Sequence, residues 1–282
     1  MHIYVVESNK MYVKSTHTQH WVVGGLLVST LLASWPQWLW LARRNSDGSD
    51  DPWGVVAMLT IIALVYADKD QLQVPKASAL SVTALLAITA SAAWGGLPPI
   101  LSTAIALMAC TWLIAHMLPK TRALSPLLAL AMLALPLVAS LNFYLGYPLR
   151  WFCAHSTSVL LSAFGTVTSP EGASLWWNGK TILIDAPCAG IAMLWIGLYL
   201  GALFSYLNSA QTLRTLINLS MAGALVILAN VIRNTLLFYK ESGMLDLPHW
   251  THEAIGLVTF ALFVPCVYFV CHAQFSFKRS TP

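Results

Sequence analysis

Residues 185–207 read DAPCAGIAMLWIGLYLGALFSYL, a polar start that carries a thiol and leads into a long apolar run. The run is long enough to cross the roughly 30 Å hydrocarbon core of a bilayer, which takes about 20 apolar residues in a helix. Two further apolar segments follow at 213–239 and 253–271. If the chain passes out, back and out again, the start of the first, the end of the second and the start of the third lie on one face of the membrane.

The composition places the whole chain in a membrane. Hydrophobic residues make up 57% of the 282 residues, charged residues only 9%, and the mean hydropathy is +0.68. Soluble domains carry roughly 25% charged residues. The net charge of +4 comes from residues scattered between apolar segments, so the chain is not expected to bind nucleic acid.

Apolar windows predict an all-α polytopic membrane protein with about eight transmembrane helices. The windows are 21–42, 53–67, 77–95, 98–117, 124–147, 186–207, 213–239 and 253–271. The second window is short and is either a tilted span or a re-entrant piece, so seven spans is the alternative. The first window runs into Arg43 and Arg44 without a small-residue cleavage site, which indicates an uncleaved anchor.

Basic residues favour an orientation with both termini in the cytoplasm. With eight spans, nine Lys and Arg residues are cytoplasmic and six lie on the other side, which agrees weakly with the positive-inside rule. The cytoplasmic set is Lys10, Lys14, Lys69, Lys76, Lys120, Arg122, Arg214, Lys278 and Arg279.

The longest connection, 148–185, is predicted to lie outside the cytoplasm. Its first part, 150–164, mixes aromatic and aliphatic residues with Ser and Thr, which suits a helix at the membrane interface. Its second part has Asn178-Gly179 before the β-branched run of 181–184, which is a β-hairpin signal. The short hairpin precedes the sixth long helix. It is expected to cover the candidate site around Cys188 on the extracytoplasmic side.

Cys188 is the candidate nucleophile. Asp185 and Pro187 form the usual start of a helix, a capping side chain followed by proline, so Cys188 is predicted to lie in the first turn. The helix dipole there lowers a thiol pKa, whereas burial raises it, and a nearby cation would decide the balance. Ala189 and Gly190 leave room for a substrate backbone, although small residues also serve helix packing.

The other four cysteines are interpreted as apolar packing residues. They are Cys110, Cys153, Cys266 and Cys271. No two cysteines of the chain form a CxxC pair or the spacing of a disulfide framework, so no metal site and no cofactor is predicted.

Arg233 is a charged residue within an apolar segment, about six residues from its predicted end. Such a residue costs about 2.5–3.5 kcal/mol to insert and normally faces a partner or a wet cavity. Asn230, three residues earlier, shares its face, and Asn234 is predicted to point to a different one. A snorkelling arginine that only fixes the depth of the helix is the alternative.

His252 is the candidate general base and acid. It precedes the last apolar segment, next to Glu253. A neutral imidazole there could take the thiol proton and later protonate a leaving amine, while Arg233 stabilises the developing negative charge. His249 is a rival for this role. The sequence His252-Glu253-Ala254-Ile255-Gly256 lacks the second histidine of a zinc-protease motif.

These three motifs, in this order, resemble the exosortase and archaeosortase family of membrane-embedded cysteine transpeptidases. The similar parts are Pro187-Cys188-Ala189-Gly190, Asn230-Val231-Ile232-Arg233, and His252 with Gly256. Ala189 stands where a serine is common in the family. The apolar windows divide the chain into a cytoplasmic tail at 1–20, five transmembrane helices at 21–147, the extracytoplasmic segment 148–185 and a three-helix core at 186–272, which the resemblance implies is catalytic. A cytoplasmic tail at 273–282 follows.

The resemblance also implies a function. Cys188, Arg233 and His252 would be catalytic, with Asn230, Asp185 and Gly190 supporting them. The enzyme would be a thiol protease or transpeptidase of the bacterial inner membrane, with its active site on the periplasmic side. It would cleave C-terminal sorting signals of exported proteins, in which a Pro-Glu-Pro-like motif precedes a transmembrane helix and a basic tail. The acceptor could be a membrane lipid or glycan, in surface anchoring linked to exopolysaccharide production.

Three alternatives remain open from the residues alone. A cysteine protease that hydrolyses its substrate would have the same site. A transporter or polysaccharide-assembly protein could use Arg233 to bind an anionic substrate, and it would tolerate loss of the thiol. A structural membrane subunit would need a carboxylate from another chain to pair with Arg233.

Overall fold

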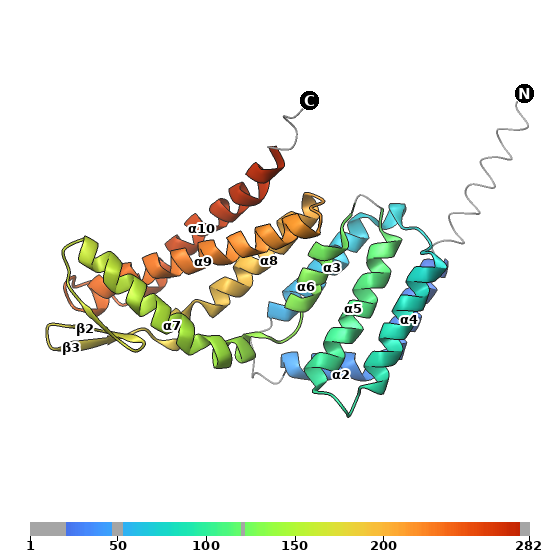
Figure 1. Ribbon diagram of the computed structural model, residues 1–282, viewed down its shortest axis with the longest axis horizontal. Coiled ribbons are helices and arrows are strands. Elements are labelled where there is room, and N and C mark those ends of the chain that lie inside the picture. The colour runs from blue at the N-terminus through green and yellow to red at the C-terminus, as the bar shows by residue number, and fades with distance from the viewer. Residues whose placement is uncertain (1–20, 47–52, 120–121, 277–282) are drawn as a thin grey trace, which may run out of the picture. The chain divides into compact units, whose positions relative to one another are not determined.

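The computed structural model describes residues 21–46, 53–119 and 122–276, nearly all of them in helices (Figure 1). They divide into two compact units, one within Met1–Pro136 together with Ser209–Thr212, the other within Leu137–Asn208 together with Leu213–Pro282. The predicted tail 1–20 and residues 277–282 of the predicted tail 273–282 lie outside the described residues, whereas 273–276 continue the last helix.

The first unit is built from helices alone. They are Trp21–Ala33, α2 (Trp35–Ser46), α3 (Trp53–Ala67), a 3₁₀ turn η1 (Lys69–Gln71), α4 (Ala77–Ala92), α5 (Pro99–Met117) and α6 (Leu124–Leu133). α5 packs against α2, α4 and α6, and α3 packs against α6. The core of this unit therefore lies around α5.

Two buried polar side chains of the first unit make hydrogen bonds between helices or to the loop after α5. Gln37, fully buried in α2, donates to the carbonyl of Ala90 at 2.8 Å and to the hydroxyl of Ser102 at 3.0 Å. Asp68, at the end of α3, accepts two hydrogen bonds from the guanidinium of Arg122, at 3.0 and 3.2 Å. Such bonds offset the free energy of removing polar groups from water.

Two of the predicted spans are broken. The window 21–42 is bent by 73° between Trp21–Ala33 and Trp35–Ser46, because Pro36 has no N–H to continue the helix. The window 124–147 ends as α6 at Leu133, just before Pro136, and the chain then enters α7 (Val138–Ala163). The expected interfacial helix at 150–164 is thus not separate, since α7 continues through Pro148 to Ala163.

The second unit holds the predicted hairpin and the last three apolar segments. Its elements after α7 are β1 (Ser169–Glu171), β2 (Ser174–Trp177), β3 (Lys180–Leu183), a 3₁₀ turn η2 (Ala186–Ala189), α8 (Ile191–Leu207), α9 (Thr212–Glu241) and α10 (Thr251–Ser276). α8 packs against α7 and α10. α9 and α10 are long enough to span a membrane, in agreement with the windows that predicted them.

The hairpin prediction is confirmed, and a third strand joins it. β2 pairs with β3 in antiparallel register around Asn178 and Gly179, whose φ values of 45° and 79° are those of a tight hairpin turn. β1 pairs with the other side of β2, which gives the order β1-β2-β3. β1 was not predicted; its central residue, Pro170, is tolerated because β1 is an edge strand.

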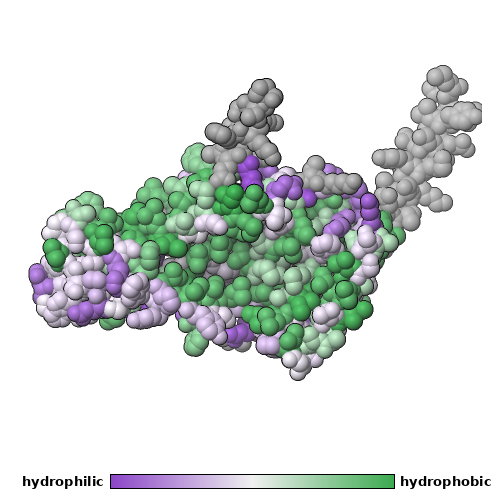
Figure 2. Space-filling model, in the orientation of Figure 1, coloured by the Kyte–Doolittle hydropathy of each residue, from purple (hydrophilic) through white to green (hydrophobic). Residues whose placement is uncertain are grey.

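Three of the described helices are long and apolar enough to cross a membrane, or up to five if each of two bent pairs counts as one span. α3, α4 and α8 are apolar but shorter, at 15, 16 and 17 residues. The predicted count of eight spans is therefore not established. In Figure 2 hydrophobic residues cover most of the visible helical surface, and hydrophilic residues gather over the end of the second unit that carries β2 and β3.

Candidate active site

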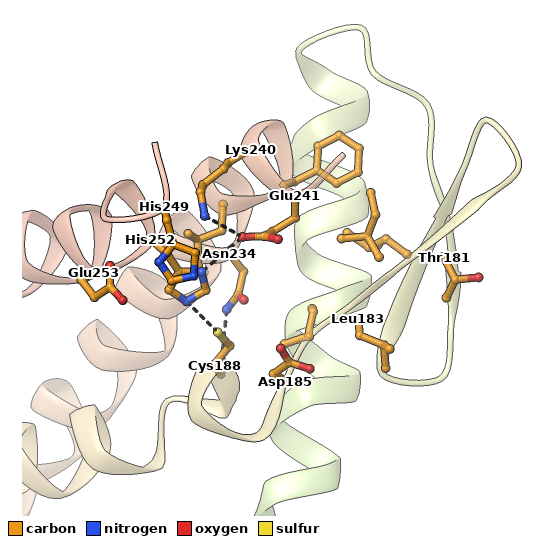
Figure 3. A pocket seen from close by; sticks show the side chains of 15 residues that line it. Thr181, Leu183, Asp185, Cys188, Asn234, Lys240, Glu241, His249, His252 and Glu253 are labelled. Carbon is orange, nitrogen blue, oxygen red and sulfur yellow. Dashed lines mark hydrogen bonds and ion pairs between the residues drawn. The ribbon is translucent and has the colours of Figure 1, made fainter. Parts of the chain in front are cut away.

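A cavity of about 560 Å³ lies in the second unit between β3 and the facing ends of α9 and α10. Cys188 lines it from η2, and His252 lines it from the first turn of α10 (Figure 3). The Sγ atom of Cys188 is 3.8 Å from Nε2 of His252. Two residues that the sequence placed on one face of the membrane are therefore in contact, within hydrogen-bonding range for sulfur.

His252 has a second partner, which the sequence reasoning missed. Its Nδ1 atom is 3.3 Å from Oε1 of Glu241, the last residue of α9. In the neutral imidazole, a hydrogen bond to this carboxylate places the proton on Nδ1 and leaves the lone pair of Nε2 facing the thiol. Cys188, His252 and Glu241 thus form a chain of thiol, imidazole and carboxylate, an arrangement that can serve as nucleophile, base and orienting group.

A signal for Glu241 was present in the sequence. It lies seven residues after Asn234 and eleven after Asn230, which is close to two and three helical turns. All three therefore share a face of α9. The predicted segment ended at 239, two residues too early, because Lys240 and Glu241 are charged. Lys240 also pairs with Glu241, with Nζ 3.3 Å from Oε1.

The local structure around Cys188 differs from the predicted helix start. Cys188 lies in the 3₁₀ turn η2, and α8 begins only at Ile191. The side chain of Asp185 makes no capping hydrogen bond; it is exposed and lines the cavity. The residue that precedes α8 is Gly190, with φ of 83°.

Gly190 separates the two elements because only glycine adopts that backbone conformation without strain. A Cβ atom at this position would lie 2.8 Å from Cγ and Nδ2 of Asn230. The space that was predicted to admit a substrate backbone is therefore occupied by the Asn230 side chain. Gly190 acts by letting α9 approach η2.

Two asparagines of α9 hold the backbone of the nucleophile. Nδ2 of Asn230 donates to the carbonyl of Cys188 at 3.0 Å and approaches Sγ of Cys153 at 3.1 Å. Nδ2 of Asn234 donates to the same carbonyl at 3.3 Å and to the carbonyl of Asn230 at 2.8 Å. Asn234 lines the cavity, whereas Arg233 does not, and it shares the face of Asn230, four residues earlier.

Arg233 lies eight residues before the end of α9, or roughly 12 Å at about 1.5 Å per residue. Its guanidinium packs against Gly256 of α10, where a Cβ atom would come within 3.3 Å of Nε. Nε is buried, and no hydrogen-bond acceptor for it exists among the residues that the structure describes. Arg233 does not line the 560 Å³ cavity. Within the described part of the chain, its Nε is therefore a buried donor without a partner.

The electrostatic surroundings favour a protonated thiol in the resting state. Burial raises the pKa of Cys188, which is only 5% exposed, above its ordinary value. The Arg233 guanidinium lowers the pKa of this thiol, and the carboxylates of Asp185 and Glu241 raise it further. Arg233 supplies the cation that was anticipated, but it lowers the pKa of the thiol by less than burial raises it. A base is therefore needed to remove the thiol proton.

His249 was the other candidate for the base. His249 lines the cavity, but the contact with the thiol is made by His252. Within the described ranges, no group of three or more His, Cys, Asp or Glu side chains could hold a metal ion. The described cysteines are all free thiols.

Comparison with known proteins gives one result. No curated protein and no solved structure matches the sequence. The family model described as transmembrane exosortase matches residues 40–269, which is well over half of the chain and includes all three motifs. The chain belongs to the transmembrane exosortase family.

Proposed function

We propose that this exosortase-family protein is a cysteine transpeptidase or protease that cleaves C-terminal sorting signals of exported proteins at the outer face of the bacterial inner membrane. The single observation that carries the proposal is the 3.8 Å contact between Cys188 and His252, with Glu241 on the far nitrogen of the imidazole. Family membership supports a role in processing sorting signals at a general level.

The first half of the reaction uses residues already in contact. Nε2 of His252 takes the Sγ proton of Cys188, and the sulfur attacks the carbonyl carbon of the scissile peptide bond. Glu241 stabilises the imidazolium that forms and keeps the ring in place. As the tetrahedral intermediate collapses, the carbon–nitrogen bond breaks, and the imidazolium gives its proton to the leaving amine. The product is a thioester on Cys188.

Arg233 is proposed to stabilise the negative charge that develops during this step. Its Nε is a buried donor without a partner in the described part of the chain, and its charge acts on the Cys188 thiol. A preorganised cation is most effective where water is excluded. The asparagines serve a different role: Asn230 and Asn234 fix the Cys188 carbonyl and thereby the direction of the thiol.

The second half of the reaction regenerates the free thiol of Cys188. An acceptor nucleophile attacks the thioester, His252 removes its proton, and Cys188 leaves with a proton. Water as acceptor gives hydrolysis, whereas a hydroxyl or amine of a membrane lipid or glycan gives anchoring. Transfer to a lipid or glycan is the outcome that would link the enzyme to surface anchoring and exopolysaccharide production.

An immunoblot tests the proposal. A reporter with a Pro-Glu-Pro-type motif, a transmembrane helix and a basic tail is co-expressed with the wild type, Cys188→Ala or Cys266→Ala at equal enzyme levels. Cys266 is an exposed cysteine of α10 outside the 560 Å³ cavity and serves as the matched control. We expect the wild type and Cys266→Ala to shorten the reporter, and Cys188→Ala to leave it at full length. Normal processing by Cys188→Ala would refute the nucleophile and favour an anion-binding role of Arg233.

A further inference from the structure

β3 has one hydrogen-bonding edge that the sheet does not use. It is the outer strand in the order β1-β2-β3. The N–H of Ile184 donates to the carbonyl of Ala173 on the side of β2. Backbone groups alternate in direction along a strand, so Ile182 also faces β2, while Thr181 and Leu183 present their N–H and C=O groups to the other side. Neither residue has a backbone partner there among the described residues.

The free edge runs along the cavity that contains the nucleophile. Thr181, Ile182, Leu183, Ile184 and Asp185 all line it, together with Cys188 and His252. Thr181, Ile182 and Leu183 belong to β3, and successive strand residues point to opposite faces of a sheet, so a cavity lined by all three reaches the edge of the strand. Figure 3 shows this strand leading directly into the turn that carries Cys188.

Side chains along this edge fit a strand that binds a partner. Ile182 and Ile184 are buried, at 9% and 4% exposure, and anchor β3 to the unit. Leu183, between them, is 66% exposed. The anchored strand offers a fixed row of backbone donors and acceptors, and an exposed apolar side chain stands above the cavity.

The opposite edge of the sheet is closed to such pairing. Pro170, at the centre of β1, lies opposite Leu175, whose own backbone groups pair with Ile182 on the β3 side. The nitrogen of Pro170 therefore faces outward and has no hydrogen to donate. Proline on an exposed edge is a common way to prevent strand addition. β3 lacks this protection on the side where the cavity lies.

We propose that the peptide substrate binds as an added strand on the free edge of β3, through backbone hydrogen bonds to Thr181 and Leu183. This inference rests on the proposed function. Strand addition recognises an extended peptide mainly by its main chain, with pockets for alternate side chains. Residues upstream of the scissile bond occupy this edge and run parallel to β3 toward Cys188, because the downstream part continues into a membrane helix on the side of α8.

Proline substitution on the enzyme tests the backbone contacts. Leu183→Pro and Thr181→Pro each remove one outward N–H and leave the inward bonds to β2 in place. We expect each to cut the reporter roughly three- to tenfold more slowly, the effect of one lost hydrogen bond. The matched control is Pro170→Ala, which changes the outward position of the opposite edge and should leave the rate unchanged.

Disulfide trapping provides a second readout that does not need a folded proline variant. Leu183→Cys is combined with Cys188→Ala, and a single cysteine is moved through the reporter residues upstream of the cleavage site. An added strand predicts cross-links at every second reporter position, since side chains alternate between faces. Cys188→Ala without the new cysteine gives the background.

The outcomes separate this inference from the proposed function. If the wild type cleaves the reporter but cross-linking shows no alternation, or the folded proline variants cleave at the wild-type rate, strand addition is wrong and the cysteine enzyme stands. If the wild type does not cleave the reporter, or Cys188→Ala does, the proposed function itself fails.

Discussion

Oε1 of Glu241 lies 3.3 Å from Nδ1 of His252, on the opposite side of the imidazole ring from the Cys188 thiol. This contact joins the last residue of α9 to the first turn of α10. It fixes which ring nitrogen is free to accept the thiol proton. Glu241 therefore lies within the candidate site even though it belongs to none of the three sequence motifs.

Replacing Glu241 by Gln is expected to slow reporter cleavage roughly ten- to hundredfold, because a hydrogen bond to a charged group contributes about 1.5–3 kcal/mol. The amide keeps the size of the side chain but loses the charge that stabilises the imidazolium. Glu253→Gln is the matched control, since Glu253 also lines the cavity and belongs to the same turn as His252. Equal rates for Glu241→Gln and wild type would remove Glu241 from the mechanism.

The alkylation rate of Cys188 is expected to depend on pH in a way that Arg233 controls. Burial raises the pKa of this thiol, so its labelling by iodoacetamide should keep increasing as the pH rises past the range of an ordinary cysteine. Arg233 lowers that pKa, so Arg233→Ala should shift the labelling curve to higher pH, and Arg233→Lys should shift it less. The measurement uses a variant whose only cysteine is Cys188. A curve that moves to lower pH in Arg233→Ala would contradict the assignment.

Gly190→Ala is expected to destabilise the second unit. The positive φ costs roughly 1–2 kcal/mol for any residue with a Cβ atom, and that atom would also meet Asn230 at 2.8 Å. Gly165→Ala isolates the first effect, because Gly165 has φ of 84° but open space around it. Thermal unfolding in detergent should show a larger loss for Gly190→Ala. Similar losses for the two variants would mean that Asn230 moves aside without cost.

Gly256→Ala is expected to reduce cleavage several-fold without lowering the amount of folded protein. Alanine favours a helix by about 1 kcal/mol over glycine, but here its Cβ would come within 3.3 Å of Arg233 Nε and push the guanidinium from its place. Gly223→Ala in α9, with its nearest atom at 3.8 Å, is the control that should keep full activity. Unchanged activity in Gly256→Ala would argue against a precise position for Arg233.

The sequence by itself determined the membrane class, most helix locations and the three motifs. Long apolar windows predict α5, α9 and α10, because hydropathy is a property of contiguous residues. Asn178-Gly179 predicts the hairpin, because its residues accept the left-handed backbone that the turn requires. Pro36 and Pro136 can also be read from the sequence. The two predicted windows that extend across these prolines are the two that the structure divides into separate helices.

Only the tertiary structure decided how the site is assembled. Glu241 meets His252 because the connection 242–250 folds the end of α9 against the start of α10, and no local pattern encodes that contact. Gly190 leaves room for the Asn230 side chain rather than for a substrate, because α9 passes close to η2. The state of the Cys188 thiol follows from the balance of burial against the Arg233 charge. Each of these depends on distances between different helices and turns, which hydropathy and local propensity do not contain.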